Sequence, residues 1–372
     1  MLKPAGKFAA RALERWLSGE YRSLEMIKLP PGTPDPAPET ELSCQELQKS
    51  QEVYYLAPAF YDLQVNGYDG VMLDEEITRE GLARITASLK EDGVFRFAPT
   101  VITCSYEHMR ETLETVRSLF LKFRSSIPGV HLEGPFISPA KKGIHEERFI
   151  RKMTERDLSL LLEYREEVAY ITADPAAVPP EYLKKLTAAG IRVSLGHTAA
   201  TAAEAREFFA GGASLVTHLH NAMSHARGGR DPMATEAALA DDRDYAGVIA
   251  DGIHVAWPEI IIARKCLGER FMLVTDALAA AGVRKPLPSF RFAGTTVFND
   301  PEKGCINADG TLGGSRLTML SGVKNLIRYA GFTPEAALIA ASEAPFRAMG
   351  ETPEIFLVLD ENMNIRGAFR IV

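Results

Sequence analysis

The 372-residue sequence predicts an α/β protein built as a (β/α)8 TIM barrel with a small β-sandwich module. Eight short apolar segments follow one another along the chain at intervals of about 20–40 residues, and amphipathic segments lie between most of them. Alternating strands and helices indicate a parallel sheet, and eight repeats of the unit favour a closed barrel. A barrel uses about 250 residues as one domain, which leaves enough chain for the module.

The predicted barrel strands share a short apolar core bounded by polar or glycine residues. They are AFYDLQV (59–65), VFRFAPTVI (94–102), GVHLEG (129–134), VAYITA (168–173), RVSLGH (192–197), SLVTHLH (214–220), YAGVIADG (245–252) and RFMLVTDA (270–277). Helices are predicted over 78–93, 106–124, 154–167, 181–190, 201–212 and 258–268. Several of these end in glycine, as helix C-termini often do. An open doubly wound sheet is the alternative, but no G-x-G-x-x-G follows the first strand.

The two ends of the chain predict the small module. Residues 22–29 alternate like a strand, and residues 355–372 indicate two strands around an Asp-Glu-Asn turn. An amphipathic helix is expected over 7–18 and a proline-rich loop over 30–50. Because termini often lie close together, we expect three segments: 1–57 and 343–372, which share the module, and 58–342, which forms the barrel.

Composition excludes several classes of function. Lys and Arg number 42 against 49 Asp and Glu, a net charge of −7, so a nucleic-acid ligand is not expected. No run of 18 apolar residues is present, so no membrane span is expected. Four cysteines in so long a chain fit the reducing cytoplasm, where we expect the protein to act.

Polar residues stand at the carboxyl ends of the predicted strands, where a barrel places its active site. Glu133, His197, His218 and Asp276 come from four different strands. One carboxylate and two imidazoles are a suitable ligand set for a catalytic Zn²⁺ that keeps one position open, and Fe²⁺ accepts similar ligands. Gln64 and Asn66 lie two residues apart at the end of the first strand and so share one of its faces.

At these residues the sequence resembles the N-acetylglucosamine-6-phosphate deacetylases of the metal-dependent amidohydrolase superfamily. The matching segments run in family order from about residue 55 to 345 and leave residues 1–50 largely unmatched. They are DLQVNGYDG (62–70), APTVIT (98–103), GVHLEGPFISPAKKGIH (129–145), SLGHT (194–198), VTHLHNAM (216–223), ADGIHV (250–255), LVTDALAAAG (273–282) and DGTLGGSRLTM (309–319).

The resemblance implies a role for each matching residue. Glu133, His197 and His218 would bind one divalent ion per subunit, and Asp276 would act as catalytic base and acid. His145 would polarise the amide carbonyl of N-acetylglucosamine 6-phosphate, which would be hydrolysed to glucosamine 6-phosphate and acetate. The expected substrate contacts are Gln64, Asn66, His145, Asn221, Ala222, Arg230, His254 and Leu312. His254 and Arg230 would hold the phosphate, with Arg230 coming from the neighbouring subunit of a homodimer.

Several alternatives stay open at this point. Gln64-Val65-Asn66 replaces the His-x-His of many superfamily members, so we expect one tightly held metal, with Zn²⁺ preferred to Fe²⁺. Arg227 competes with Arg230 as the phosphate ligand, and His220 either supports His218 or fills the barrel mouth. Hydrolysis of another N-acyl sugar or of a cyclic amide is the alternative function. A non-catalytic protein is disfavoured, because all four strand-end candidates are present.

Overall fold

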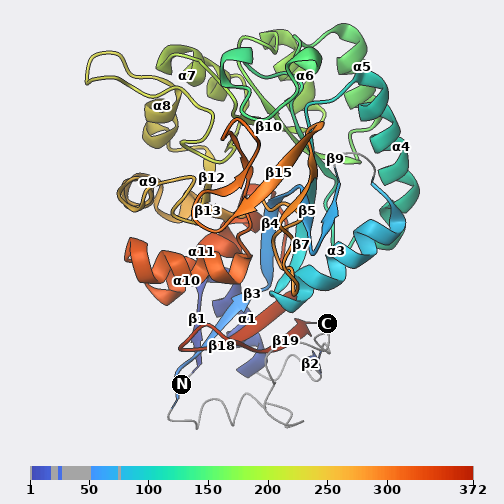
Figure 1. Cartoon of the computed structure of the whole chain (residues 1–372). Helices are drawn as coiled ribbons and strands as arrows, with labels where there is room; N and C mark the ends of the chain where they lie inside the picture. The colour runs from blue at the N-terminus through green and yellow to red at the C-terminus, as the bar shows by residue number, and fades with distance from the viewer. Residues whose placement is uncertain (1, 18–23, 27–51, 74–76, 372) are drawn as a thin grey trace.

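The computed structural model describes residues 2–17, 24–26, 52–73 and 77–371. Its centre is a sheet of eight parallel strands in the order β4-β7-β8-β9-β10-β11-β12-β13, which confirms the predicted barrel (Figure 1). The strands are β4 (Phe60–Val65), β7 (Val94–Ile102), β8 (Val130–Glu133), β9 (Val168–Ala173), β10 (Arg192–Leu195), β11 (Leu215–Val216), β12 (Tyr245–Ile249) and β13 (Phe271–Val274).

The first and last strands of this sheet meet at their carboxyl ends. Val65 forms a parallel bridge with Ala277, and the Asn66 amide donates to the Ala277 carbonyl over 2.9 Å. Lower down, the buried Asp62 carboxylate accepts a hydrogen bond from the Thr275 amide at 3.2 Å. The Asp62 side chain therefore takes the place of a backbone acceptor between β4 and β13, where the barrel closes.

Helices follow the strands, and several begin at capping residues. Thr154 and Asp157 form a capping box at the start of α5, and Thr201 and Glu204 form another at α7. Such caps satisfy amide groups that have no partner within the helix. The helices that follow barrel strands are α3 (Arg79–Glu91), α4 (Tyr106–Phe123), α5 (Glu155–Glu163), α6 (Pro180–Ala188), α7 (Ala202–Ala210), α8 (Ala234–Ala240), α9 (Trp257–Leu267), α10 (Met319–Ala330), α11 (Pro334–Ala341) and α12 (Glu343–Ala348).

Three of the strands that end earlier than the sequence predicts stop before a site residue. His197, His218 and Asp276 lie two residues beyond the ends of β10, β11 and β13. Their φ angles are 46°, 30° and 51°, in the left-handed region that residues with a side chain rarely adopt. This conformation ends the extended ladder. The expectation that these residues belong to the strands was therefore wrong.

The two ends of the chain form one five-stranded sheet at the bottom of Figure 1, in the order β1-β3-β18-β19-β2. Its strands are β1 (Leu2–Pro4), β2 (Leu24–Met26), β3 (Tyr54–Pro58), β18 (Ile355–Asp360) and β19 (Ile365–Ile371). Helix α1 (Gly6–Leu17) packs Ala9 and Ala12 against Leu56 and Phe356 of this sheet. Within the described residues, a helix thus supplies the second layer, where the sequence suggested a sandwich. The loop expected over 30–50 lies outside the described residues.

A second small sheet was not predicted. It is antiparallel, inserted between β13 and α10, and consists of β14 (Ser289–Phe292), β15 (Thr295–Asp300), β16 (Gly304–Ile306) and β17 (Leu312–Gly314). A short hairpin, β5 (Gly67–Tyr68) and β6 (Val71–Met72), follows β4. Single turns of 3-10 helix lie at η1 (Pro139–Lys141), η2 (Glu147–Phe149) and η3 (Gly268–Arg270).

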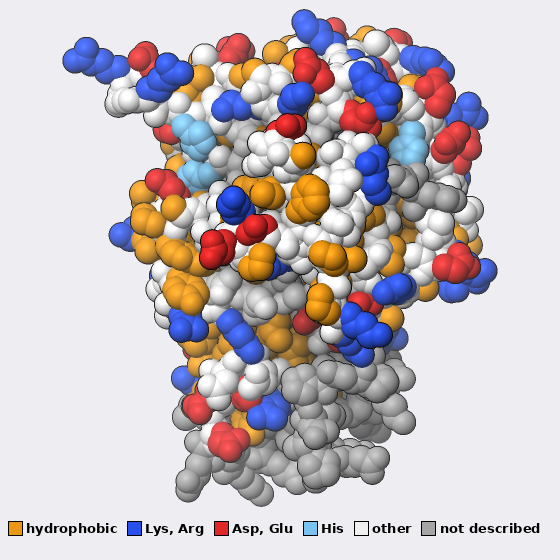
Figure 2. Space-filling model, viewed as in Figure 1, with side chains coloured by type: hydrophobic (Ala, Val, Ile, Leu, Met, Phe, Trp, Pro, Cys, Tyr) orange, Lys and Arg blue, Asp and Glu red, His pale blue; other side chains and the backbone are white. Residues whose placement is uncertain are grey.

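The surface agrees with the composition. On the face drawn in Figure 2, Lys and Arg side chains are interspersed with Asp and Glu. Among the described helices, none is both long enough and apolar enough to cross a membrane.

Candidate active site

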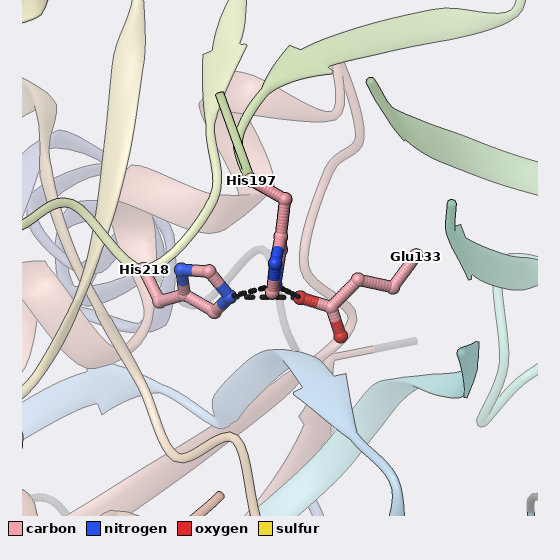
Figure 3. Close-up of side chains that lie close together, drawn as sticks. All are labelled: Glu133, His197 and His218. Carbon is pink, nitrogen blue, oxygen red and sulfur yellow. Dashed lines mark hydrogen bonds and ion pairs between the residues drawn. The ribbon is translucent and has the colours of Figure 1, made fainter. Parts of the chain in front are cut away.

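Three side chains from different strands converge at the carboxyl end of the barrel. Glu133 is the last residue of β8, and its Oε1 atom lies 2.8 Å from Nε2 of His218 and 3.2 Å from Nε2 of His197 (Figure 3). The two Nε2 atoms lie 3.1 Å apart. All three residues are buried, with 2–5% of their surface exposed. The sequence expectation that these residues come together is confirmed.

The proton arrangement of His197 shows what this cluster can bind. Its Nδ1 atom lies 2.8 Å from the Lys141 carbonyl, which can only accept, so Nδ1 carries a proton. Nε2 is then the ring nitrogen that can bind a cation, and it points at Glu133 and His218. Ligand atoms that converge on one buried point fit a cation between them. Two imidazole nitrogens and a carboxylate oxygen suit Zn²⁺, so the residues present fit the metal that the sequence suggested.

Gln64 and Glu133 connect the first strand to this cluster. The Gln64 amide nitrogen lies 3.1 Å from both carboxylate oxygens of Glu133. Burial alone would raise the pKa of Glu133, but hydrogen bonds with His197 and His218 hold this pKa well below its usual range. The carboxylate is therefore ionised and fixed in orientation.

Asp276 lies beside the cluster at the mouth of the barrel. The Asn66 amide donates to its Oδ1 atom over 2.7 Å. Burial, followed by the negative charge of Glu133, raises the pKa of Asp276 well above its usual range. A carboxyl group with a raised pKa can both accept and release a proton near neutral pH, as a general base and acid must.

His145 contributes a second proton-bearing group. Its ring lies 4.4 Å from that of His197, centroid to centroid, and its Nδ1 atom lies 2.8 Å from the Thr103 hydroxyl. The alternative acceptor for this hydroxyl, the Glu133 carbonyl, is 3.4 Å away. Burial, and then the neighbouring His197, lower the pKa of His145 well below its usual value, so the ring is neutral. If the Thr103 hydroxyl donates to Nδ1 and not to the Glu133 carbonyl, the proton of the neutral His145 ring lies on Nε2.

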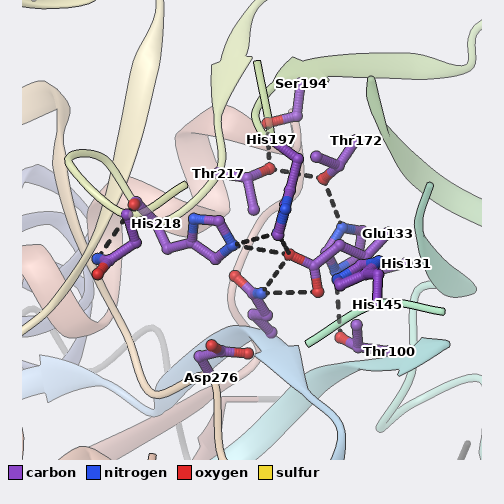
Figure 4. A network of polar contacts seen from close by, with 12 residues as sticks. Thr100, His131, Glu133, His145, Thr172, Ser194, His197, Thr217, His218 and Asp276 are labelled. Carbon is purple, nitrogen blue, oxygen red and sulfur yellow. Dashed lines mark hydrogen bonds and ion pairs between the residues drawn. The ribbon is translucent and has the colours of Figure 1, made fainter. Parts of the chain in front are cut away.

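A network of buried hydrogen bonds surrounds the cluster (Figure 4). The His131 ring contacts the hydroxyls of Thr100 at 3.1 Å and Thr172 at 2.7 Å. Thr217 continues the chain at 2.6 Å to both Thr172 and Ser194. Burial lowers the pKa of His131 to about 3, so this histidine is neutral. Neighbouring strands are thus tied together near Glu133.

The cluster opens into a cavity of about 310 Å³. The predicted site residues that line it are His145, His197, His218, Asn221, Ala222, His254, Asp276 and Leu312. Leu312 belongs to the inserted sheet, which forms one wall of the cavity. The Nε2 atom of His254 is buried and has no hydrogen-bond partner in the described part of the chain.

Arg230 and Arg227 are not brought to this cavity. Both side chains are exposed on the loop that precedes α8, and neither is among the described residues that line the cavity. His220 is partly buried and stacks on His225, with ring centroids 5.8 Å apart. One chain alone therefore does not show how an arginine would reach the ligand.

The sequence did not predict that Thr103 and Asp251 orient two of the site histidines. Thr103 contacts His145, and Asp251 contacts His254 at 2.7 Å. Asp251 was detectable in principle, because an Asp that starts a loop often accepts hydrogen bonds from the amides two and three residues later. Thr103 carries no such local signal, since its partner lies 42 residues away.

Comparisons with known proteins show the family to which the chain belongs. Residues 55–355 match the model of the amidohydrolase family. The chain is 34% identical to the N-acetylglucosamine-6-phosphate deacetylase of Haemophilus influenzae, over 79% of this chain and 77% of that protein. It is 37% identical to the N-acetylgalactosamine-6-phosphate deacetylase of a Shewanella species, over 72% of this chain and 68% of that protein.

Solved structures give the same result. The crystal structure of N-acetylglucosamine-6-phosphate deacetylase from Pasteurella multocida superposes with a TM-score of 0.80 and 33% identity. The match covers 84% of each chain. The eight-stranded barrel, the buried carboxylate–imidazole cluster and the extent of these matches lead to one assignment. The chain is a member of the amidohydrolase family.

Proposed function

We propose that this protein hydrolyses the N-acetyl group of N-acetylglucosamine 6-phosphate to give glucosamine 6-phosphate and acetate. The observation that carries the proposal is the placement of Asp276, a buried acid with a raised pKa, beside three converging ligand atoms in a cavity. The deacetylases of Haemophilus and Pasteurella described above support the choice of substrate. We further propose that the reaction takes place in the cytoplasm, which the few cysteines favour.

Glu133, His197 and His218 would hold one divalent ion, for which we propose Zn²⁺. Such an ion, when bound, lowers the pKa of a coordinated water and withdraws electron density from the amide carbonyl. The chain itself fixes the ligand geometry. Gln64 orients Glu133, and the Lys141 carbonyl orients His197.

Asp276 would move the proton. Its carboxylate accepts a proton from the attacking water and delivers it to the amine nitrogen as the carbon–nitrogen bond breaks. The proton acquired from water thus leaves with glucosamine 6-phosphate, and the hydroxyl oxygen leaves in acetate. The hydrogen bond from Asn66 keeps one carboxylate oxygen in place during both transfers.

His145 would stabilise the negative charge that develops on the carbonyl oxygen. With its proton on Nε2, the neutral ring donates a hydrogen bond to that oxygen. One such donor typically lowers the activation free energy of the reaction by about 3–4 kcal/mol. Asn221, Ala222 and Leu312 line the cavity and would contact the sugar.

The phosphate would be held by His254 and by Arg230 of a second subunit. We propose a homodimer because Arg230 is exposed on a loop and lies apart from the cavity of its own chain. An arginine can pair two phosphate oxygens at once. Arg227, three residues earlier on the same loop, is the competing candidate.

N-acetylgalactosamine 6-phosphate is the second candidate substrate. The identity to the Shewanella deacetylase favours it, and the two sugars differ only in the orientation of one hydroxyl group. Another N-acyl sugar or a cyclic amide would fit the same chemistry less specifically.

Acetate release from a panel of substrates tests the proposal. The panel contains the 6-phosphates of N-acetylglucosamine, N-acetylgalactosamine and N-acetylmannosamine, together with unphosphorylated N-acetylglucosamine. We expect the highest kcat/KM for N-acetylglucosamine 6-phosphate and loss of activity after chelation. A higher kcat/KM for another member would replace the proposed substrate, and no acetate release from any member would refute deacetylation.

A further inference from the structure

The loop after β12 contains a carboxylate that is fully engaged with one histidine and its backbone. Oδ2 of Asp251 lies 2.7 Å from Nδ1 of His254. Oδ1 accepts hydrogen bonds from the amides of Ile253 at 2.8 Å and His254 at 2.9 Å. The His254 and Asp251 side chains are 5% and 11% exposed. Asp251 thus fixes both the ring and the backbone of His254.

This contact determines which nitrogen of His254 is available to a ligand. A carboxylate offers only acceptors, so Nδ1 must carry a proton. The other nitrogen, Nε2, is buried without a partner in the described part of the chain, although His254 lines the cavity. Because buried polar atoms are nearly always hydrogen-bonded, this orphaned nitrogen marks a place for a ligand atom. With Nδ1 protonated, Nε2 donates only when the ring carries a positive charge.

The charged groups around the cavity determine how an anion could be held there. Burial would raise the pKa of Asp251, but hydrogen bonds and attraction from His254 hold it below its usual range, so Asp251 is a carboxylate at neutral pH. Lys141 is the only lysine or arginine among the described residues lining the cavity. A single chain therefore offers little fixed positive charge to a phosphate, and a histidine between a carboxylate and a phosphate would supply more.

We propose that Asp251 is a positioning residue that sets the preference for phosphorylated sugars by acting through His254. It fixes the ring, keeps a proton on Nδ1, and stabilises the positive charge that the ring carries while Nε2 donates to a phosphate oxygen. This inference rests on the proposed function and adds to it the residue that makes His254 selective for an anion.

Steady-state kinetics of Asp251→Asn in the metal-loaded enzyme test the proposal. Asparagine keeps the size of the side chain and removes the charge. With N-acetylglucosamine 6-phosphate, we expect KM to rise about 10- to 100-fold, the ratio associated with one charge-assisted hydrogen bond, while kcat changes little. With unphosphorylated N-acetylglucosamine, kcat/KM stays unchanged. Asp244→Asn is the matched control, because Asp244 is a buried acid paired with Arg270 at the other end of β12.

A double-mutant cycle separates positioning from general structural support. If Asp251 acts through His254, Asp251→Asn adds nothing in the His254→Asn background. Additive effects, or equal losses with both sugars, would overturn the proposal. If Asp251→Asn does not yield folded protein, Asp251→Ser replaces it with the same expectations, since a serine hydroxyl can still cap the loop amides but carries no charge.

The wild-type measurements distinguish failure of the proposed function from failure of the proposed role of Asp251. If the wild type shows no preference for the phosphorylated sugar, the proposed function fails and this inference fails with it. If the wild type shows the preference and Asp251→Asn retains it, only the role of Asp251 is overturned.

Discussion

Single contacts determine the protonation state of the groups proposed to act in catalysis. The Thr103 hydroxyl, 2.8 Å from Nδ1 of His145, can leave the proton of that histidine on Nε2. Only this tautomer of the neutral ring can donate to a substrate carbonyl. The proposed role of His145 therefore depends on a residue that does not line the cavity.

Removing the Thr103 hydroxyl tests this dependence. We expect Thr103→Val to lower kcat about 10- to 100-fold with little change in KM, the range typical of partners that orient active-site histidines. Thr103→Ser, which keeps the hydroxyl, should retain most of the activity. Equal losses in the two variants would show that packing of the methyl group, and not the hydroxyl, matters.

Asp62 contributes to closing the barrel, because it accepts a hydrogen bond from the Thr275 amide. It is fully buried, and burial raises its pKa to about 7 although Thr275 and Gln64 donate hydrogen bonds to it. The folded protein thus binds a proton more tightly than the unfolded chain does, so stability falls as pH rises from about 4 to about 7.

The pH dependence of unfolding checks this sign. Urea unfolding of the wild type and Asp62→Asn, from pH 5 to pH 8, should show the wild type losing a few kcal/mol relative to the variant. A difference between the two proteins that does not change with pH would mean that Asp62 titrates normally.

At the scale of elements, the inserted sheet contacts the backbone of Asp276, the proposed catalytic base. Gly314 of β17 has a φ of 154°, and a Cβ atom there would lie 2.8 Å from the Asp276 carbonyl. The Ser315 amide donates to that same carbonyl at 2.8 Å. The sheet therefore holds the Asp276 backbone, which itself has a left-handed conformation.

Gly314→Ala should displace Asp276 and lower kcat at least about 10-fold, because small misplacements of reacting groups are costly. Gly310→Ala is the matched control in the same inserted segment. It shares a positive φ of 80°, but no atom lies within 4 Å of the added Cβ. We expect this control to lose some stability and to keep kcat. Similar kcat values in both variants would contradict the role of β17.

At the scale of the whole molecule, the barrel was predictable from the sequence, but the inserted sheet and the left-handed site residues were not. Strand and helix periodicity identified β7 and β9 to the residue, because nearly every residue of these strands is buried. The inserted sheet was missed because it interrupts the βα alternation. The left-handed conformations at His197 and His218 are imposed by tertiary packing and have no local signal. Arg230 is exposed and does not line the cavity of its own chain, so its contact with the phosphate stays a prediction.

Mixing two impaired variants tests whether Arg230 acts across a dimer interface. Arg230→Ala lacks the proposed phosphate ligand, and Asp276→Asn lacks the proposed base. In a mixed dimer, one site regains both native residues if Arg230 comes from the partner, so random reassociation should restore about a quarter of wild-type activity. No recovery on mixing, with dimers demonstrated, would place Arg230 in its own subunit's site or exclude it.

The proposed activity depends on a single catalytic cation held by Glu133, His197 and His218. Metal quantification of the purified protein, paired with acetate release before and after chelation, tests that dependence. We expect one equivalent of a divalent ion per chain, loss of the ion and of activity together, and recovery of both with Zn²⁺; His218→Asn should bind far less. Full activity in metal-free protein, or an unchanged metal content in His218→Asn, would contradict the account.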